Sequence, residues 1–549
     1  MRHFRATSLI FLLLWALVLG GGSLRAGEPG GEGASPLTVE RALQGEEADA
    51  AEQALARLLA RRGPTLETLV LLGRVRLLRG DPVAARRAFL QAWKKERGDL
   101  SALLGLARCE LLLQEPRRAL DLARSALARF PRDEEAASLE VRALLDLGRP
   151  WEALSRARRA REALGEALPG PDLLEALGAA LFRCGLVKEA ARAYERALLQ
   201  RPHLAEAHIR LGTGLRPPSG KEPPASLFLG VDAFRRGDLS RAEALFEKSW
   251  RAAPADPVCH RLLGEVLLER ERRRSFLLRH PVFRKMKSLL ADPGPGKLPL
   301  GRFFPGYASL SPRRKAQVHR TARAWGRYLP RLALLGARHD LLDPTESATL
   351  ARERARLRGR RTADGRFWDE VRGVGGFHAA TGVEALDEAA SFGFDTLAHE
   401  VTHQVHLFAM SSAERRRVDR LYQKALREGR CLDYYAATCP EEYLAQGFEA
   451  FLSPAKIPGT KRTHGHTRLE LVRLDPDLER FLRRRAAWDP FRGRKGKALL
   501  EAAAEWALLA GRFDDVLTAA DLMGRGITQH VRDLRDQALA EKVLLRGRP

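Results

Sequence analysis

Two histidines and a glutamate stand close together in the segment H-E-V-T-H at residues 399–403. Residues four apart lie above one another on an α-helix, so His399 and His403 can bind one zinc ion through bonds of about 2.0–2.1 Å. Glu400 would lie beside this pair, where it could act as a general base for a zinc-bound water. Zinc lowers the pKa of such a water toward about 7 and polarises a carbonyl group. The segment therefore predicts zinc-dependent hydrolysis.

The surrounding residues predict a single helix over Phe394–Phe408. Leu397, Val401 and Val405 recur at intervals of three or four residues and would form a buried stripe. The histidines would then lie on another face, toward a cavity. The alternative interpretation is a surface helix with two solvent-facing histidines.

A nearby third histidine does not complete the site. His406 follows His399 by seven residues, a rise of about 10.5 Å along a straight helix, so the two cannot reach one ion. A histidine six residues after His403 is also absent, because position 409 is alanine.

A carboxylate on a second helix is the better third ligand. The segment P-E-E-Y-L-A-Q-G-F-E-A-F begins at Pro440, which suits a helix start. Glu442 lies on one face of this helix and would complete a His-His-Glu site, leaving the fourth position for water. Glu441 is the alternative ligand.

These motifs resemble the gluzincin metallopeptidases, in particular the lethal-factor-like group. The sequence E-Y-x-A-x-x-F runs from residue 442 to 448, and W-D-x-V-x-G-x-G runs from 368 to 375. The resemblance covers about residues 365–455 and implies an α+β zincin-like fold, a Zn²⁺ cofactor and a peptide substrate. It also implies that Tyr435, seven residues before Glu442, hydrogen-bonds the oxyanion, or Tyr434 if the register shifts by one. The family usually has a glutamate where this chain has Gln446, which puts one hydrogen bond near the ligands in doubt.

The glycine-rich segment Val371–Phe377 has strand character. Glycines permit close approach of another backbone. In zincin folds an edge strand above the zinc helix holds substrate as an added strand, and this segment is placed to do so. A glycine-rich turn is the alternative interpretation.

An earlier part of the chain repeats itself. Small residues recur in a first helix, and four of the six intervals between them are 34 residues; an insertion near 165–171 lengthens one interval and a shortened unit near 217–224 reduces another. Alanines follow twelve residues after each full start, and Phe89, Tyr194 and Phe246 follow four residues later in three units. The first-helix positions are Gly73, Ala107, Val141, Gly178, Gly212, Gly230 and Gly264.

This pattern resembles the tetratricopeptide repeat. It implies an all-α solenoid over residues 39–271, in which small residues let helices approach and aromatic rings fill the remaining gaps. The recurring glycines, alanines and aromatic residues would serve packing between helices, and partners would bind the concave groove. The period is lost after Glu271, and D-P-G-P-G at 292–296 predicts a turn.

The N-terminus reads as a secretory signal over residues 1–26. A basic stretch precedes an apolar run at Leu9–Leu19, which is too short to span a membrane comfortably. We therefore expect an exported protein, periplasmic or extracellular, without a stable membrane span after signal removal. An uncleaved N-terminal anchor is the alternative.

Composition limits the classes of partner that we expect for this protein. The formal net charge is +25, but the basic residues are spread along amphipathic helices and no nucleic-acid-binding motif accompanies them, so we expect no specific nucleic-acid site. Five cysteines do not make a disulfide scaffold, although Cys431 and Cys439 could pair. The H-G-H segment at 464–466 is interpreted as a loop at the cleft rim, not as a ligand set.

The sequence thus predicts a multidomain protein. A tetratricopeptide array would be followed by a zinc metallopeptidase domain at residues 272–490 and a weakly repeat-like helical segment at 497–545. The predicted function is an exported zinc metalloendopeptidase whose array binds protein partners or peptide substrates. The alternative is a non-catalytic scaffold that binds peptides through a peptidase-like domain.

Overall fold

The computed structural model describes residues 35–546, except 166, 213–223, 362–367, 370 and 459–464. Most of these residues are helical, and one small sheet accompanies the helices. The predicted signal segment, most of the shortened repeat near 217–224 and His464 lie outside the described residues. Among the described helices, none combines the length and apolar character needed to cross a membrane.

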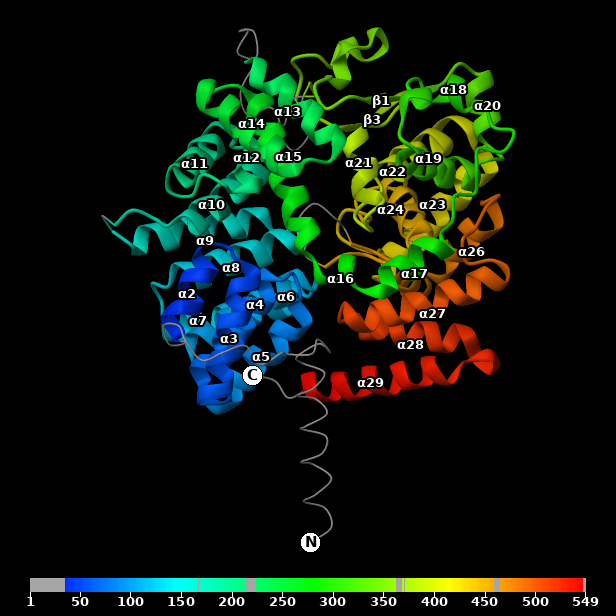
Figure 1. Cartoon of the computed structure of the whole chain (residues 1–549). Coiled ribbons are helices and arrows are strands. Elements are labelled where there is room, and N and C mark those ends of the chain that lie inside the picture. The colour runs from blue at the N-terminus through cyan, green and yellow to red at the C-terminus, as the bar shows by residue number, and fades with distance from the viewer. Residues whose placement is uncertain are drawn as a thin grey trace.

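Paired helices make up the first half of the described chain (Figure 1). Aspartates begin several of them: Asp99, for example, accepts the backbone N–H of Ala102 over 2.7 Å. The helices are α2 (Pro36–Gln44), α3 (Ala48–Arg62), α4 (Leu66–Leu78), α5 (Pro82–Lys95), α6 (Leu100–Leu112), α7 (Pro116–Arg129), α8 (Glu134–Asp146), α9 (Pro150–Ala163), α10 (Pro171–Arg183), α11 (Val187–Gln200), α12 (Ala205–Leu211), α13 (Ala225–Arg236), α14 (Leu239–Ala252) and α15 (Pro257–Arg274).

Phe89 shows why the sequence of these pairs is periodic. Its buried ring lies where a Cβ on Gly73, in the same unit, would approach to 2.5 Å. A Cβ on Gly105, in the next unit, would approach the same ring to 2.4 Å. The glycines therefore let one aromatic ring fill the space between successive units, which is the packing that the repeat pattern predicts.

The second half of the described chain contains shorter helices around a three-stranded sheet. Strand β3 lies in the middle of the sheet, parallel to β1 and antiparallel to β2, so β2 is at an edge. The elements are α16 (Phe276–Arg279), α17 (Pro281–Leu289), α18 (Leu300–Phe303), α19 (Pro312–Ala324), α20 (Leu329–Leu334), β1 (Arg338–Leu342), β2 (Gly373–Val374), β3 (His378–Gly382), α21 (Val383–Ala389), α22 (Thr396–Gln404), α23 (Ser412–Arg427), α24 (Pro440–Leu452), α25 (Arg468–Leu474), α26 (Pro476–Arg485), α27 (Gly493–Leu509), α28 (Phe513–Met523) and α29 (Gln529–Arg546).

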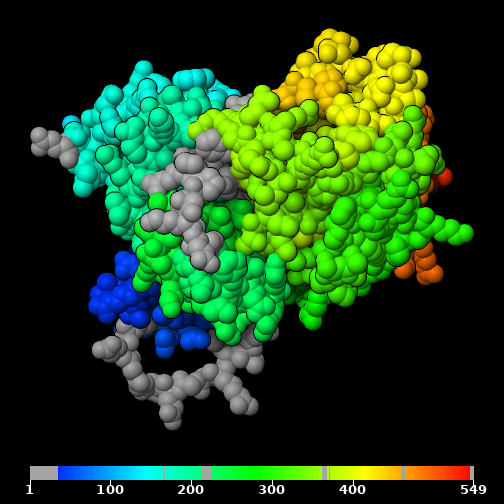
Figure 2. Space-filling model, turned by 90° about the horizontal axis from the view of Figure 1, so that it is seen from above, coloured from blue at the N-terminus to red at the C-terminus, as the bar shows by residue number. Residues whose placement is uncertain are grey.

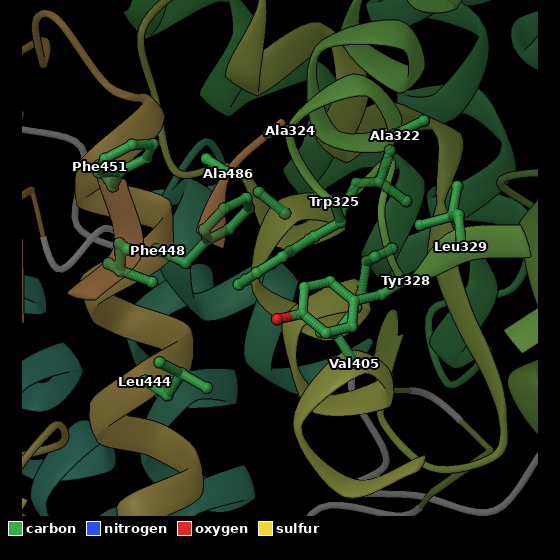
Figure 3. Close-up of a cluster of buried hydrophobic side chains, with 14 of the residues drawn as sticks. Ala322, Ala324, Trp325, Tyr328, Leu329, Val405, Leu444, Phe448, Phe451 and Ala486 are labelled. Carbon is green, nitrogen blue, oxygen red and sulfur yellow. The ribbon is translucent and has the colours of Figure 1, made fainter. Parts of the chain in front are cut away.

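The core of this half is centred on Trp325 (Figure 3). The fully buried Trp325 ring stacks on Phe448 of α24 with 4.2 Å between centroids. Its indole N–H donates a hydrogen bond of 3.0 Å to the hydroxyl of Thr402 on α22. One side chain therefore fixes the spacing between α22 and α24.

The two halves contact each other at separated places. Arg235 of α13 pairs with Asp343, which follows β1, at 2.9 Å. Arg87 of α5 pairs with Glu541 of α29 at 2.7 Å, and in Figure 1 the end of α29 lies close to α5. Figure 2 shows the green surface of the later repeats against the yellow-green surface of the second half. The second half is thus held to both early and late repeat units.

Candidate metal centre

Helix α22 carries the H-E-x-x-H segment and is shorter than the sequence predicts. Asp395 caps its N-terminus by accepting the Ala398 N–H over 2.9 Å, so Phe394 lies outside the helix. The α-helix ends at Gln404 and continues as a π-helical turn over Val405–Ala409. The prediction of a helix over Phe394–Phe408 therefore starts two residues too early, because apolar spacing does not register an N-cap. Helical structure does continue past Phe408 to Ala409, but its last turn is widened.

His399, His403 and Glu442 converge. The Nε2 atoms of the two histidines lie 3.1 Å apart. Oε2 of Glu442 lies 3.1 Å from Nε2 of His399 and 3.6 Å from Nε2 of His403. Among the described residues, this is the one group of three whose ligand atoms lie within 4.8 Å of one another.

These distances fit a zinc ion. Zinc bonds of about 2.0–2.1 Å in tetrahedral geometry separate neighbouring ligand atoms by about 3.3–3.4 Å. The three observed separations fall on both sides of that value. Oε2 of Glu442 is also buried, and it accepts no hydrogen bond of normal geometry from any described residue. Its contact with His399 is at ion-pair distance only. A cation would satisfy this oxygen and both imidazole nitrogens together.

The electrostatics of the group point the same way. Burial alone would raise the pKa of Glu442, but His399 and His403 hold it well below its ordinary value. Burial would lower the pKa of His403, but Glu442 and Glu400 raise it. The His399 ring is further held by Phe394, whose centroid lies 5.5 Å away.

The remaining sequence candidates lie outside this group. His406 is buried on the π-helical turn, where burial lowers its pKa, and it contributes no atom to the group. Glu441 also contributes none. Cys431 and Cys439 are both free thiols, so the suggested disulfide between them is absent from the structure.

We call His399, His403 and Glu442 the candidate metal group, or metal group for short. His466, from the H-G-H segment, forms ion pairs instead of joining this group. Its Nε2 lies 3.1 Å from Asp433 and its Nδ1 lies 3.0 Å from Glu470. It is buried, and it lines the same cavity as His399, His403 and Glu442.

Glu400 lies under the backbone of β2. A Cβ on Gly373 would approach Oε1 of Glu400 to 2.8 Å, and one on Gly375 would approach Oε2 to 3.2 Å. Larger residues at these positions would push the strand away from the carboxylate. Only Gly373–Val374 of the segment Val371–Phe377 pairs as strand, so the segment combines a short edge strand with a turn.

The two neighbouring tyrosines point to different partners. The Tyr435 hydroxyl donates to Oε1 of Glu442 over 3.2 Å, and the side chain faces the cavity. The Tyr434 hydroxyl instead accepts a hydrogen bond of 2.7 Å from Arg183 of the repeat array. Of the two, Tyr435 is therefore the one beside the metal group. Gln446 is buried, and its amide has no hydrogen-bond partner among the described residues.

One cavity of about 2110 Å³ joins the metal group to the repeat array. The metal group, Glu400 and Tyr435 line one side. Residues of the repeat helices line the other, among them Arg142, Phe182 and Arg183. The repeat pattern predicts a concave groove, but nothing in it predicts that this groove opens onto the metal group.

The chain contains tetratricopeptide repeats. The family model described as "Tetratricopeptide repeat" matches residues 76–142. Among solved structures, the thermophilic TPR protein TTC0263 from Thermus thermophilus is 22% identical, over 32% of this chain and 94% of that one, with a TM-score of 0.29. A tetratricopeptide repeat protein from Parabacteroides merdae is 14% identical, over 42% and 96%, with a TM-score of 0.25. No curated protein matches the chain.

Proposed function

We propose that the protein is an exported zinc-dependent metalloendopeptidase whose tetratricopeptide array binds the protein or peptide substrate. The observation that carries this proposal is the convergence of His399, His403 and Glu442 beside Glu400 in the cavity that the array lines. These three residues would hold Zn²⁺. The ion, when bound, would polarise the scissile carbonyl and make a water acidic enough to attack near neutral pH.

Glu400 would move the protons of the reaction. Its carboxylate would accept a proton as the water oxygen bonds to the carbonyl carbon. The same proton would pass to the amide nitrogen as the C–N bond breaks. The second proton of the water would then leave the new carboxyl group for the amine, so that a carboxylate and an ammonium group are formed. Gly373 of β2 lies against this carboxylate, so a substrate strand added to β2 would come within its reach.

Tyr435 would stabilise the negative charge that develops on the carbonyl oxygen. Its hydroxyl is 3.2 Å from Glu442, at the rim of the metal group, and its side chain is 37% exposed to the cavity. A donor placed where charge develops stabilises the transition state more than the ground state.

A non-catalytic scaffold is the competing function, and the tetratricopeptide repeats favour protein binding whether or not the site is active. Measurements of bound zinc and of peptide hydrolysis distinguish the two functions. We expect the full chain to purify with one zinc per molecule and to cleave an unfolded protein in a reaction that a chelator stops and zinc restores. His403→Ala should lose both properties. A wild type without stoichiometric zinc would overturn the peptidase proposal, whereas zinc without any cleavage would favour the scaffold.

A further inference from the structure

Tyr434 joins the metal-site half of the protein to the repeat array. Nη2 of Arg183, the last residue of α10, donates to the Tyr434 hydroxyl over 2.7 Å. The Arg183 guanidinium carbon also lies 5.4 Å from the centroid of the Tyr434 ring. A hydrogen bond and a cation–π contact therefore act on the same ring.

A second repeat unit also lies close to the Tyr434 ring. Gly148, in the turn between α8 and α9, has a φ of +71°, and a Cβ there would lie 3.0 Å from Cγ of Tyr434. Glycine is suited to this turn because it tolerates the left-handed conformation and leaves room for the ring. We call Gly148, Arg183 and Tyr434 the tyrosine anchor.

The segment that carries the anchor also carries Tyr435. Residues 430–439 are the last ten of the connection between α23 and α24, and they form no helix. Local hydrogen bonds stiffen the segment: the Ala436 N–H donates to Asp433 over 2.6 Å, and the Thr438 hydroxyl donates to the Tyr435 carbonyl over 2.7 Å. A displacement of Tyr434 would therefore move Tyr435.

We infer that the repeat array positions Tyr435 through the tyrosine anchor, so that the array takes part in catalysis as well as in binding. Arg183 and Tyr434 are positioning residues, because neither belongs to the metal group. This inference rests on the proposed function. Tyr435 is more than one-third exposed, so packing around its own side chain restrains it less than packing restrains a buried residue. The position of Tyr435 therefore depends more on its chain neighbour, Tyr434.

The first test removes the anchor in the full-length protein. Arg183→Gln and Tyr434→Phe each break the 2.7 Å hydrogen bond, and Arg192→Gln, an exposed arginine of α11 outside the cavity lining, is the matched control. We expect faster amide hydrogen exchange in residues 430–439 and a kcat about tenfold lower in both anchor variants. Zinc content and melting temperature should stay near those of the wild type. Unchanged exchange in residues 430–439 would overturn the inference.

The second test asks whether the anchor acts through Tyr435. If it does, Arg183→Gln should lower kcat by less than twofold in a Tyr435→Phe background, although it lowers it about tenfold in the wild type. Equal losses in both backgrounds would show a general structural effect and overturn the inference. If the wild type hydrolyses nothing, the proposed function fails separately. Faster exchange in the Arg183→Gln protein would still support positioning of the segment, and unchanged exchange would still refute it.

Discussion

The backbone N–H of Asp395 donates a hydrogen bond of 3.0 Å to Oε1 of Glu449. Asp395 caps the helix that carries both histidines, and Glu449 lies on α24, seven residues after Glu442. The buried Lys456 ammonium pairs with the same glutamate and donates to the carbonyl of Gly393 over 2.9 Å. The start of the helix that carries both histidines is therefore tied to the last turn of the helix that carries Glu442.

Replacing Glu449 should weaken both the fold and the metal site. Glu449→Gln removes the carboxylate that pairs with the buried Lys456 ammonium, and removing one partner of a buried ion pair costs about 3–5 kcal/mol. We expect this loss in urea denaturation, together with weaker zinc binding measured by competition with a chelator. The double variant Glu449→Gln, Lys456→Met should recover part of the stability, because neither charge remains buried. Equal stability of wild type and Glu449→Gln would show that the pair does not hold the helices.

Glu400→Gln separates metal binding from proton transfer. The amide cannot accept the proton of the attacking water, and the group of three ligand atoms does not include Glu400. We expect stoichiometric zinc in the purified variant and a rate of peptide hydrolysis lower by about 10²- to 10⁴-fold. Zinc is measured by elemental analysis and hydrolysis by a quenched fluorescent peptide. A variant that cleaves at the wild-type rate would remove Glu400 from the mechanism.

Tyr435→Phe tests the oxyanion role. The variant loses the hydroxyl near Glu442 but keeps the ring, so ground-state binding should change little. We expect kcat to fall about 10²- to 10³-fold with KM nearly unchanged. Tyr307→Phe, at a tyrosine that does not line the cavity, is the control. A rise in KM at constant kcat would indicate that Tyr435 binds substrate and does not stabilise the transition state.

Local spacing in the sequence was enough to predict the repeat packing and to select candidate metal ligands that lie together in the structure. In the units that have both residues, the glycine and the aromatic ring sixteen residues later meet because helical periodicity fixes their separation, as Gly73 and Phe89 show. Likewise, four-residue spacing on a helix brings His399 and His403 together. Glu442 could be selected because its segment predicts a second helix that begins at Pro440 and places Glu442 on one face, although this left Glu441 as an alternative.

Contacts between distant segments could not be predicted in this way. Arg183 and Tyr434 are 251 residues apart, and neither has a local pattern that indicates the other. Trp325 reaches Thr402 because tertiary packing brings them together, not because of sequence spacing. The π-helical turn after Gln404 also escaped prediction, because it changes the backbone hydrogen bonds without changing the apolar pattern.

A single methyl group should disturb the repeat array at Gly105. Alanine usually stabilises a helix by about 0.5–1 kcal/mol relative to glycine. At Gly105, however, its Cβ would lie 2.4 Å from the buried ring of Phe89, and overpacking costs about 1–3 kcal/mol. We therefore expect Gly105→Ala to lower the free energy of unfolding. Gly301→Ala, where the Cβ meets no atom within 4 Å, should be neutral or stabilising. A stabilised Gly105→Ala protein would contradict the packing seen around Phe89.

His466 should make stability fall as the pH rises. Burial would lower its pKa, but the carboxylates of Glu470 and Asp433 raise it from an ordinary value of 6.5 to about 10. Arg512, which also pairs with Glu470, is the cation facing this group. Because the folded-state pKa is raised, the stabilisation is fully present below about pH 6.5 and is lost as the pH approaches 10.

His466→Gln tests this pH dependence. Urea denaturation at pH 6 and pH 10 should show the variant less stable by on the order of 3 kcal/mol at pH 6, with most of that difference gone at pH 10. Comparing the two proteins at each pH removes the contribution of tyrosines and lysines that titrate near pH 10 in both. A loss of stability of the same size at both pH values would mean that His466 stabilises the fold through packing. Its ion pairs with Asp433 and Glu470 would then contribute nothing to stability.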